Sequence, residues 1–143
     1  MELGLALCTR LTTLDMSAND IGAYGVVSVA RLIMAALQLT TLRLRSNNLG
    51  PDGAECLGAV MHRHTVLTEL DVSDNGMGSD GVAKFARALR LSPRLATLNV
   101  SANRMGAEGA KHFGAAMGQC HGLTALDLSC NAIGSGGMAR VKE

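Results

Sequence analysis

The 143-residue sequence is poor in aromatic residues, since it has no Trp, one Tyr and two Phe. Tyr24, Phe85 and Phe113 are too few to build the stacking platform on which proteins hold single-stranded nucleic acid. Net charge is small as well, because 13 Lys and Arg stand against 12 Asp and Glu and leave a formal charge of +1. No global field draws the chain to nucleic acid or to an anionic membrane, so any charge-guided binding must be local.

Long apolar runs and clustered cysteines are also missing. No run approaches the roughly 18 to 20 residues that a membrane span needs, and the segment MELGLALCTRL lacks the basic leader of a signal peptide. The four cysteines show neither the close pairing of a metal site nor the density of a disulfide-stapled secreted domain. These absences favour a reducing compartment, the cytoplasm or the nucleus, and predict no cofactor.

One repeated pattern organises the chain. The segment LTTLDMSANDIG at Leu11 returns in similar form at Leu39, Leu67, Leu95 and Leu123, each start 28 residues after the last. A fixed period without insertions predicts stacked repeats that share one continuous core. We therefore expect a single domain over residues 1–143, without linkers.

Each repeat changes its apolar period halfway. Leu42 and Leu44 lie two positions apart, which places both side chains on one face of a strand. Leu57 and Met61 then follow at helical spacing and mark the buried face of a helix. Each repeat is therefore predicted to be a short strand followed by a helix.

Two residue types recur at fixed positions within the repeat. An Asn stands where each strand ends, and its carboxamide can bind backbone groups of its own turn and of the neighbouring turn; these residues are Asn19, Asn47, Asn75, Asn103 and Asn131. A Gly opens each predicted helix, as Gly50 does, and a second Gly such as Gly53 lies in its first turn. Since Gly is unfavourable inside a helix by about 1 kcal/mol, the second Gly indicates close contact with a neighbouring backbone.

These repeats resemble the ribonuclease-inhibitor-like class of leucine-rich repeats, in which L-x-x-L-x-L-x-x-N-x-[LIM]-G-x-x-G is followed by a full helix. The resemblance covers Leu11 to Glu143. It implies an α/β fold, a right-handed horseshoe solenoid with a parallel sheet on the concave face, as in NOD-like receptors and RanGAP-type proteins. A rigid scaffold whose strand positions are variable and polar predicts a non-enzymatic module or scaffold that binds another protein through that face. The alternatives are a RanGAP-like regulator of a small GTPase, and a structural component of a cytoskeletal or ciliary assembly or of an immune sensor.

Both ends of the sequence fall inside a repeat. Residues 1–10 match the last half of a preceding helix, and the repeat that starts at Leu123 is incomplete. Neither end has the polar, atypical repeat that caps a solenoid. We therefore expect further repeats or a partner chain to cover the ends.

No cluster of residues predicts catalysis or metal binding. His62 and His64 are the closest approach to a ligand pair, but they have no acidic or thiol partner at suitable spacing, and a solvated helix end is the better interpretation. No Ser or Cys has a His and a carboxylate that the repeat would bring together. We expect no catalytic residue and no metal site.

The strand positions that point away from the core carry the predicted partner-binding residues: Asp15, Arg43, Arg45, Glu69, Asp71, Asn99 and Asp127. With strands about 4.8 Å apart, five of them form a lateral row in which Arg43 lies between Asp15 and Asp71. Arg43 either completes an internal charge ladder or contacts a partner. No packing requirement explains the presence of Arg43 together with Arg45.

A rival surface is predicted on the outer face. The first complete helix, expected over residues 24–37, carries Tyr24, Val27 and Met34 at positions where the other repeats have mostly charged or polar residues. Such an apolar patch is either a contact surface or a shield against a missing N-terminal neighbour.

Overall fold

The computed structural model describes residues 8–61 and 63–135 of the chain. A short 3-10 helix, η1 (Cys8–Arg10), comes first, and strands then alternate with helices. The elements after η1 are β1 (Thr13–Asp15), α2 (Gly22–Ala35), β2 (Thr41–Arg43), α3 (Gly50–Met61), β3 (Glu69–Asp71), α4 (Gly78–Leu89), β4 (Thr97–Asn99), α5 (Gly106–Met117) and β5 (Ala125–Asp127).

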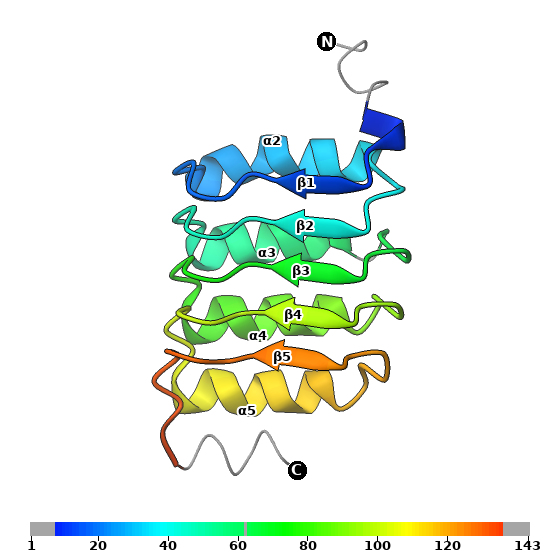
Figure 1. The fold of residues 1–143 in the computed structure, drawn as a ribbon. Helices are drawn as coiled ribbons and strands as arrows, with labels where there is room; N and C mark the ends of the chain where they lie inside the picture. Colours follow the sequence, from blue (N-terminus) through cyan, green and yellow to red (C-terminus); the bar gives the residue numbers. More distant parts are fainter. Residues whose placement is uncertain (1–7, 62, 136–143) are drawn as a thin grey trace.

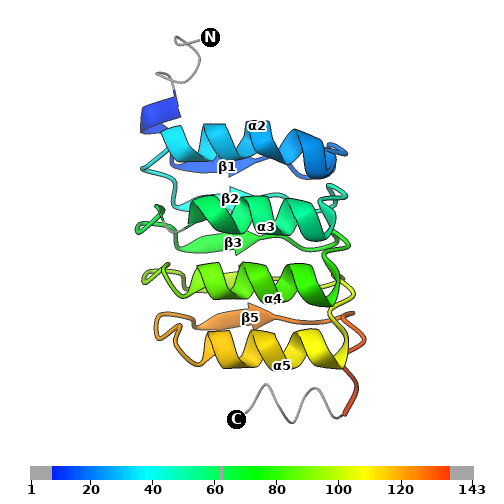
Figure 2. The same ribbon diagram turned by 180° about the vertical axis from the view of Figure 1, so that it is seen from behind.

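The strands form one parallel sheet in the order β1-β2-β3-β4-β5. Residues that pair across neighbouring strands are one repeat apart, as Leu42 and Leu70 are. The helices cover one face of this sheet and leave the other face open (Figure 1), and Figure 2 shows the helix layer from the other side. The predicted α/β solenoid of strand–helix repeats with a parallel sheet is therefore confirmed.

The core lies between the sheet and the helices. Leu42, Leu70, Phe85 and Phe113 are fully buried there, as their apolar spacing predicts. Leu126 in β5 is 38% exposed, because within the described residues β5 has a neighbouring strand on one side only.

The repeated Asn side chains form a ladder between the strands and the helices. The Asn75 Oδ1 accepts the N–H of Asn47 at 3.0 Å and that of Leu49 at 3.4 Å, both in the preceding repeat. Its Nδ2 donates to the carbonyl of Leu44 in that repeat, and to two carbonyls in its own turn, those of Val72 and Ser73. One buried carboxamide therefore satisfies backbone groups of two repeats, and the same pattern recurs at Asn47, Asn103 and Asn131.

The helices begin at the predicted glycines. Gly50 has φ +64°, a left-handed conformation that L side chains rarely adopt, and α3 starts there. The second Gly of the repeat fits the predicted close contact, because a Cβ at Gly81 would lie 2.8 Å from the Cα of Pro51 on the neighbouring helix.

The bounds of one helix differ from the sequence prediction, and two predicted end elements are described only in part. The first complete helix, α2, runs from Gly22 to Ala35 rather than over residues 24–37, because Ala36 leaves helical geometry with ψ 60° and ends the hydrogen-bonded turns. Of the predicted preceding helix only the 3-10 turn η1 is described. The helix of the incomplete last repeat begins at the predicted Gly134, and residues 1–7 and 136–143 lie outside the described residues.

We predict that Asn75→Ala lowers the free energy of unfolding by about 1 to 3 kcal/mol, because buried N–H groups of the preceding repeat and carbonyls of both repeats lose their partner. Asn19→Ala is the matched control, since Asn19 is exposed and its Nδ2 binds only carbonyls of its own turn. Urea unfolding followed by circular dichroism measures both losses. Equal losses at the two positions would contradict the role of the bonds between repeats.

A second prediction concerns the contact between neighbouring helices. Gly81→Ala should lower the free energy of unfolding by about 1 to 3 kcal/mol, because the added methyl group meets backbone that cannot move aside. Gly118→Ala should leave it unchanged or raise it slightly, since the nearest atoms to a Cβ there are at 3.8 Å. Thermal unfolding of both variants tests the difference, and a neutral Gly81→Ala would disprove the steric explanation.

Candidate functional site

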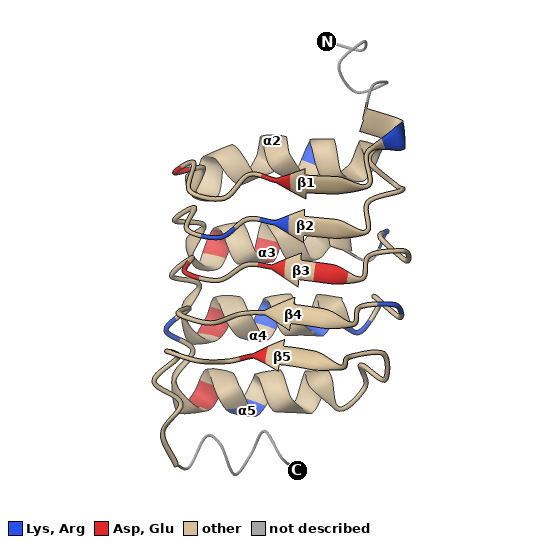
Figure 3. Cartoon of the chain, in the orientation of Figure 1, with Lys and Arg blue, Asp and Glu red and all other residues tan. Residues whose placement is uncertain are grey.

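The open face of the sheet carries the predicted partner-binding residues. The observed register places Asp15, Arg43, Asp71, Asn99 and Asp127 side by side across the five strands. Acidic and basic residues both lie on this face (Figure 3). The lateral row therefore exists with the spacing of neighbouring strands.

The shortest contacts of Arg43 are with a residue outside the row. Its Nε and Nη2 donate to one carboxylate oxygen of Glu69, at 3.0 and 2.6 Å, whereas its Nη1 is 4.0 Å from Asp15. The predicted position of Arg43 between Asp15 and Asp71 is confirmed by the register, but its shortest contacts are with Glu69, which the row did not predict. Arg43 has a long side chain that reaches diagonally to the start of β3, where Glu69 offers a closer carboxylate than Asp71.

In four repeats the side chain of the last strand residue accepts a hydrogen bond from the serine two positions later. The side-chain oxygen of Asp71 accepts the N–H and the hydroxyl of Ser73, at 2.9 and 2.6 Å. Asn99 binds Ser101 in the same way, and the N–H groups of Ser17 and Ser129 bind Asp15 and Asp127. In the second repeat Arg43 and Arg45 replace this pair, so the face is a row of fixed acceptor groups interrupted by two cations.

These hydrogen bonds keep the outer carboxylates ionised. The hydroxyl and then the N–H of Ser17 lower the pKa of Asp15, and Arg43 adds a smaller effect in the same direction. The N–H and then the hydroxyl of Ser129 lower the pKa of Asp127. Hydrogen bonds and charge from Glu69 raise the pKa of Arg43. These three groups are therefore charged near neutral pH.

Arg45 borders an open polar hollow on this face. The hollow is lined by Arg45, Ser73, Asp74, Asn99, Ser101, Ala102 and Asp127. Arg45 is exposed, and among residues 8–61 and 63–135 it makes no ion pair. Since the hydroxyls of Ser73 and Ser101 are already donated to Asp71 and Asn99, the floor offers mainly acceptors. Arg45 and the Nδ2 group of Asn99 are thus the side-chain donors beside it.

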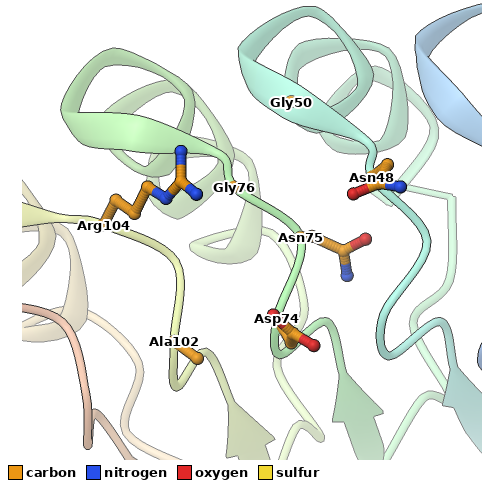
Figure 4. Close-up of a pocket in the computed structure, with 7 residues that line it drawn as sticks. All are labelled: Asn48, Gly50, Asp74, Asn75, Gly76, Ala102 and Arg104. Carbon is orange, nitrogen blue, oxygen red and sulfur yellow. The ribbon is translucent and has the colours of Figure 1, made fainter.

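A second hollow lies on the edge where strands lead into helices, and it was not predicted from the sequence. Figure 4 shows Asn48 and Arg104 on opposite sides of Gly76, with Asp74 and Asn75 beside them. Residues 48, 76 and 104 belong to one slot of the repeat, which Asp20 fills in the first repeat. The sequence contains a signal for this hollow, because Gly76 leaves a gap in a slot that carries polar side chains in the other three of the first four repeats.

His64 corrects another expectation. It is fully buried, whereas the sequence predicted a solvated helix end; His62 lies outside the described residues. The reason is its slot, which follows each helix and turns inward: Ala36 and Ser92 at the equivalent positions are also buried. The backbone N–H of His64 donates to the Met61 carbonyl, and the backbone carbonyl of His64 accepts the N–H of Leu67.

Metal-ligating side chains do not gather in the described part of the chain. No group of three or more His, Cys, Asp or Glu side chains there is placed to hold a metal ion. The cysteines at 56, 120 and 130 are free thiols, and burial raises the pKa of Cys120. Over the same residues no helix has the length and apolarity to cross a membrane.

The rival outer surface is present on α2. Tyr24 is 96% exposed, and Val27 and Met34 are also exposed. They belong to α2, and the helix layer lies on the side of the sheet opposite to its open face (Figure 2). The structure therefore separates the two predicted surfaces.

Arg43, the last residue of β2, and Arg45, two residues later, can be compared in a test of stability. Arg43→Ala leaves Asp15, Glu69 and Asp71 close together without a cation, so we predict a small fall in the unfolding midpoint that shrinks in high salt. Arg45→Ala should leave the midpoint unchanged, since no ion pair is lost. Thermal unfolding at low and high salt measures both, and a larger loss for Arg45→Ala would show that the charge assignment is wrong.

Comparison with known families gives an independent result. A family model described as "Leucine Rich repeat" matches residues 7–30, 38–58, 63–86 and 119–140. No match to the chain is found among curated proteins. The repeat that starts at Leu95 lies between the matched segments, yet it forms β4 and α5 with the same register as its neighbours. The matched segments span more than half of the sequence, and the chain belongs to the leucine-rich-repeat family.

Proposed function

We propose that this protein is a recognition module that binds another protein through the open face of its sheet, the concave face expected from the resemblance. Leucine-rich repeats are generally protein-interaction modules, and they are typically non-enzymatic. One observation carries the choice of face: Arg45 is an exposed cation without an ion pair in the described chain, at the border of a polar hollow.

Arg45 stands in a slot where the other repeats have serine, namely Ser17, Ser73, Ser101 and Ser129. Serine suffices for the local hydrogen bond, so the fold does not require a guanidinium there. An Arg presents a planar set of donors that matches a carboxylate in two parallel hydrogen bonds. Packing does not require Arg45, and its guanidinium is suited to binding a carboxylate. Both points support contact between Arg45 and an acidic group of a partner.

The rest of the hollow adds a second requirement. Asp127 is ionised, and the serine and Asn99 oxygens on the floor are acceptors. A partner that places a carboxylate on Arg45 therefore gains from a Lys, Arg or amide donor that reaches Asp127. We propose a partner surface that carries an acidic and a donor side chain close together.

The finer classification is part of the same proposal. Helices of 12 or 14 residues in a 28-residue period support the ribonuclease-inhibitor-like type. Free thiols support a reducing compartment such as the cytoplasm. A RanGAP-like role toward a GTPase, or a place in a cytoskeletal, ciliary or immune assembly, stays a prediction that the identity of the partner will decide.

The test compares the two arginines in binding. Proteins captured from a native extract should be identified by quantitative mass spectrometry with wild type, Arg45→Ala, Arg43→Ala and the outer-face control Lys111→Ala. We expect Arg45→Ala to reduce capture of the specific partner about tenfold, and the purified complex to associate more slowly, more so at low salt. Arg43→Ala and Lys111→Ala should retain most of the binding. Unchanged capture by Arg45→Ala would reject the open face as the binding site.

A further inference from the structure

The two edges of the solenoid differ in charge. One edge is formed by the loops that lead from each helix into the next strand, and the described loops 36–40, 63–68, 90–96 and 118–124 contain no Asp or Glu. The opposite edge, where strands lead into helices, carries Asp20 and Asp74 together with the cation Arg104. In Figure 3 the loops of the first edge carry blue segments and no red ones, whereas the opposite edge carries both colours. We call the first one the basic edge; its cations are Arg63, Arg90 and Arg94.

The loops of the basic edge lie side by side. The N–H of Thr68 binds the Thr40 carbonyl at 2.9 Å, and the N–H of Ala96 binds the Thr68 carbonyl at 2.9 Å. The loops that contain Leu37, Arg63 and Leu91 are therefore consecutive neighbours along one edge. Together they form a continuous strip across the first three repeats.

The three cations of the strip are exposed, and in the described part of the chain none of them makes an ion pair. Cations after a helix are favourable because they face the negative end of the helix dipole, which explains Arg63 and Arg90. Arg94 lies beyond the last turn of α4, in the approach to β4. The helix dipole does not account for it.

Exposed leucines lie among these cations. Leu91 is 59% exposed and Leu37 is 47% exposed. The slot of Leu91 is filled by Ala35, Arg63 and Gln119 in other repeats, so packing does not require an apolar side chain there. Large apolar side chains that contribute little to the core, beside unpaired cations, are the composition of a contact surface.

We propose that the basic edge is a second interaction surface, and that it binds an acidic segment of a partner protein which carries leucine or a similar apolar residue between its carboxylates. The carboxylates pair with Arg63, Arg90 and Arg94, and the apolar side chain covers Leu91 or Leu37. A nucleic acid would match the charges only and would leave the leucines in water. This surface lies at the opposite ends of the strands from Arg45, so both surfaces can be occupied at once.

The test uses a short fluorescein-labelled peptide of glutamates interrupted by leucines, with fluorescence anisotropy as the readout. Arg94→Glu should weaken its binding to the intact chain about tenfold, and Leu91→Ser several-fold. The matched control is Lys111→Glu, which reverses an exposed charge on α5 and should change the affinity little. Thermal unfolding checks that the variants are folded, which is expected because the changed residues are exposed.

Three reference measurements decide the outcome. A peptide of the same charge with serine in place of leucine should bind several-fold more weakly, and high salt should weaken both. Equal affinity for the serine peptide, or preferential binding to vesicles that contain phosphatidylserine, would overturn the proposal of an acidic, leucine-bearing protein segment. Absence of peptide binding, or an equal loss with Lys111→Glu, would overturn it as well.

Discussion

The hydrogen bonds of a buried carboxamide hold successive repeats in register, and the rest of the structure depends on them. Each loop from strand to helix turns its backbone inward, where water cannot reach the amides. Asn75 binds groups of its own loop and of the loop before it, and its neighbours do the same. The distance between these loops is thereby fixed, which fixes the spacing of the strands in turn. A helix can then begin at a left-handed Gly and pack closely on the helix beside it.

This fixed spacing gives the open face its chemistry. When strands repeat in perfect register, equivalent side chains line up, and local bonds such as Ser73 to Asp71 recur as a row. A residue that departs from the row is then easy to interpret physically. Arg43 is neutralised by Glu69, whereas Arg45 has no ion pair within the described chain. The same reasoning distinguishes the edges, because a leucine such as Leu91, in a slot that other repeats fill with smaller or polar residues, contributes little to packing.

Backbone arrangement was predictable from the sequence because it depends on periodicity, whereas contacts that depend on side-chain reach were not. The strands, the helix starts and the pairing register all result from a 28-residue period with Leu, Asn and Gly in fixed slots. The partner of Arg43 has no such basis, since a long side chain can reach more than one carboxylate. The burial of His64 could have been predicted from the small residues in its slot, but the position after a helix suggested solvent. The hollow beside Gly76 required comparing one slot across repeats for a missing side chain.

Hydrogen bonds between repeats join residues 25 to 31 positions apart in the sequence, whichever repeat they come from. In the described chain, helices contact only the helices of adjacent repeats. The entropy lost on closing each new loop is therefore the same wherever the repeat is added. A stack of this kind can lengthen without acquiring contacts of greater sequence separation, so its relative contact order falls as repeats accumulate. Folding kinetics therefore set no limit on the number of repeats. That number determines the length of the solenoid and the area of both proposed binding surfaces.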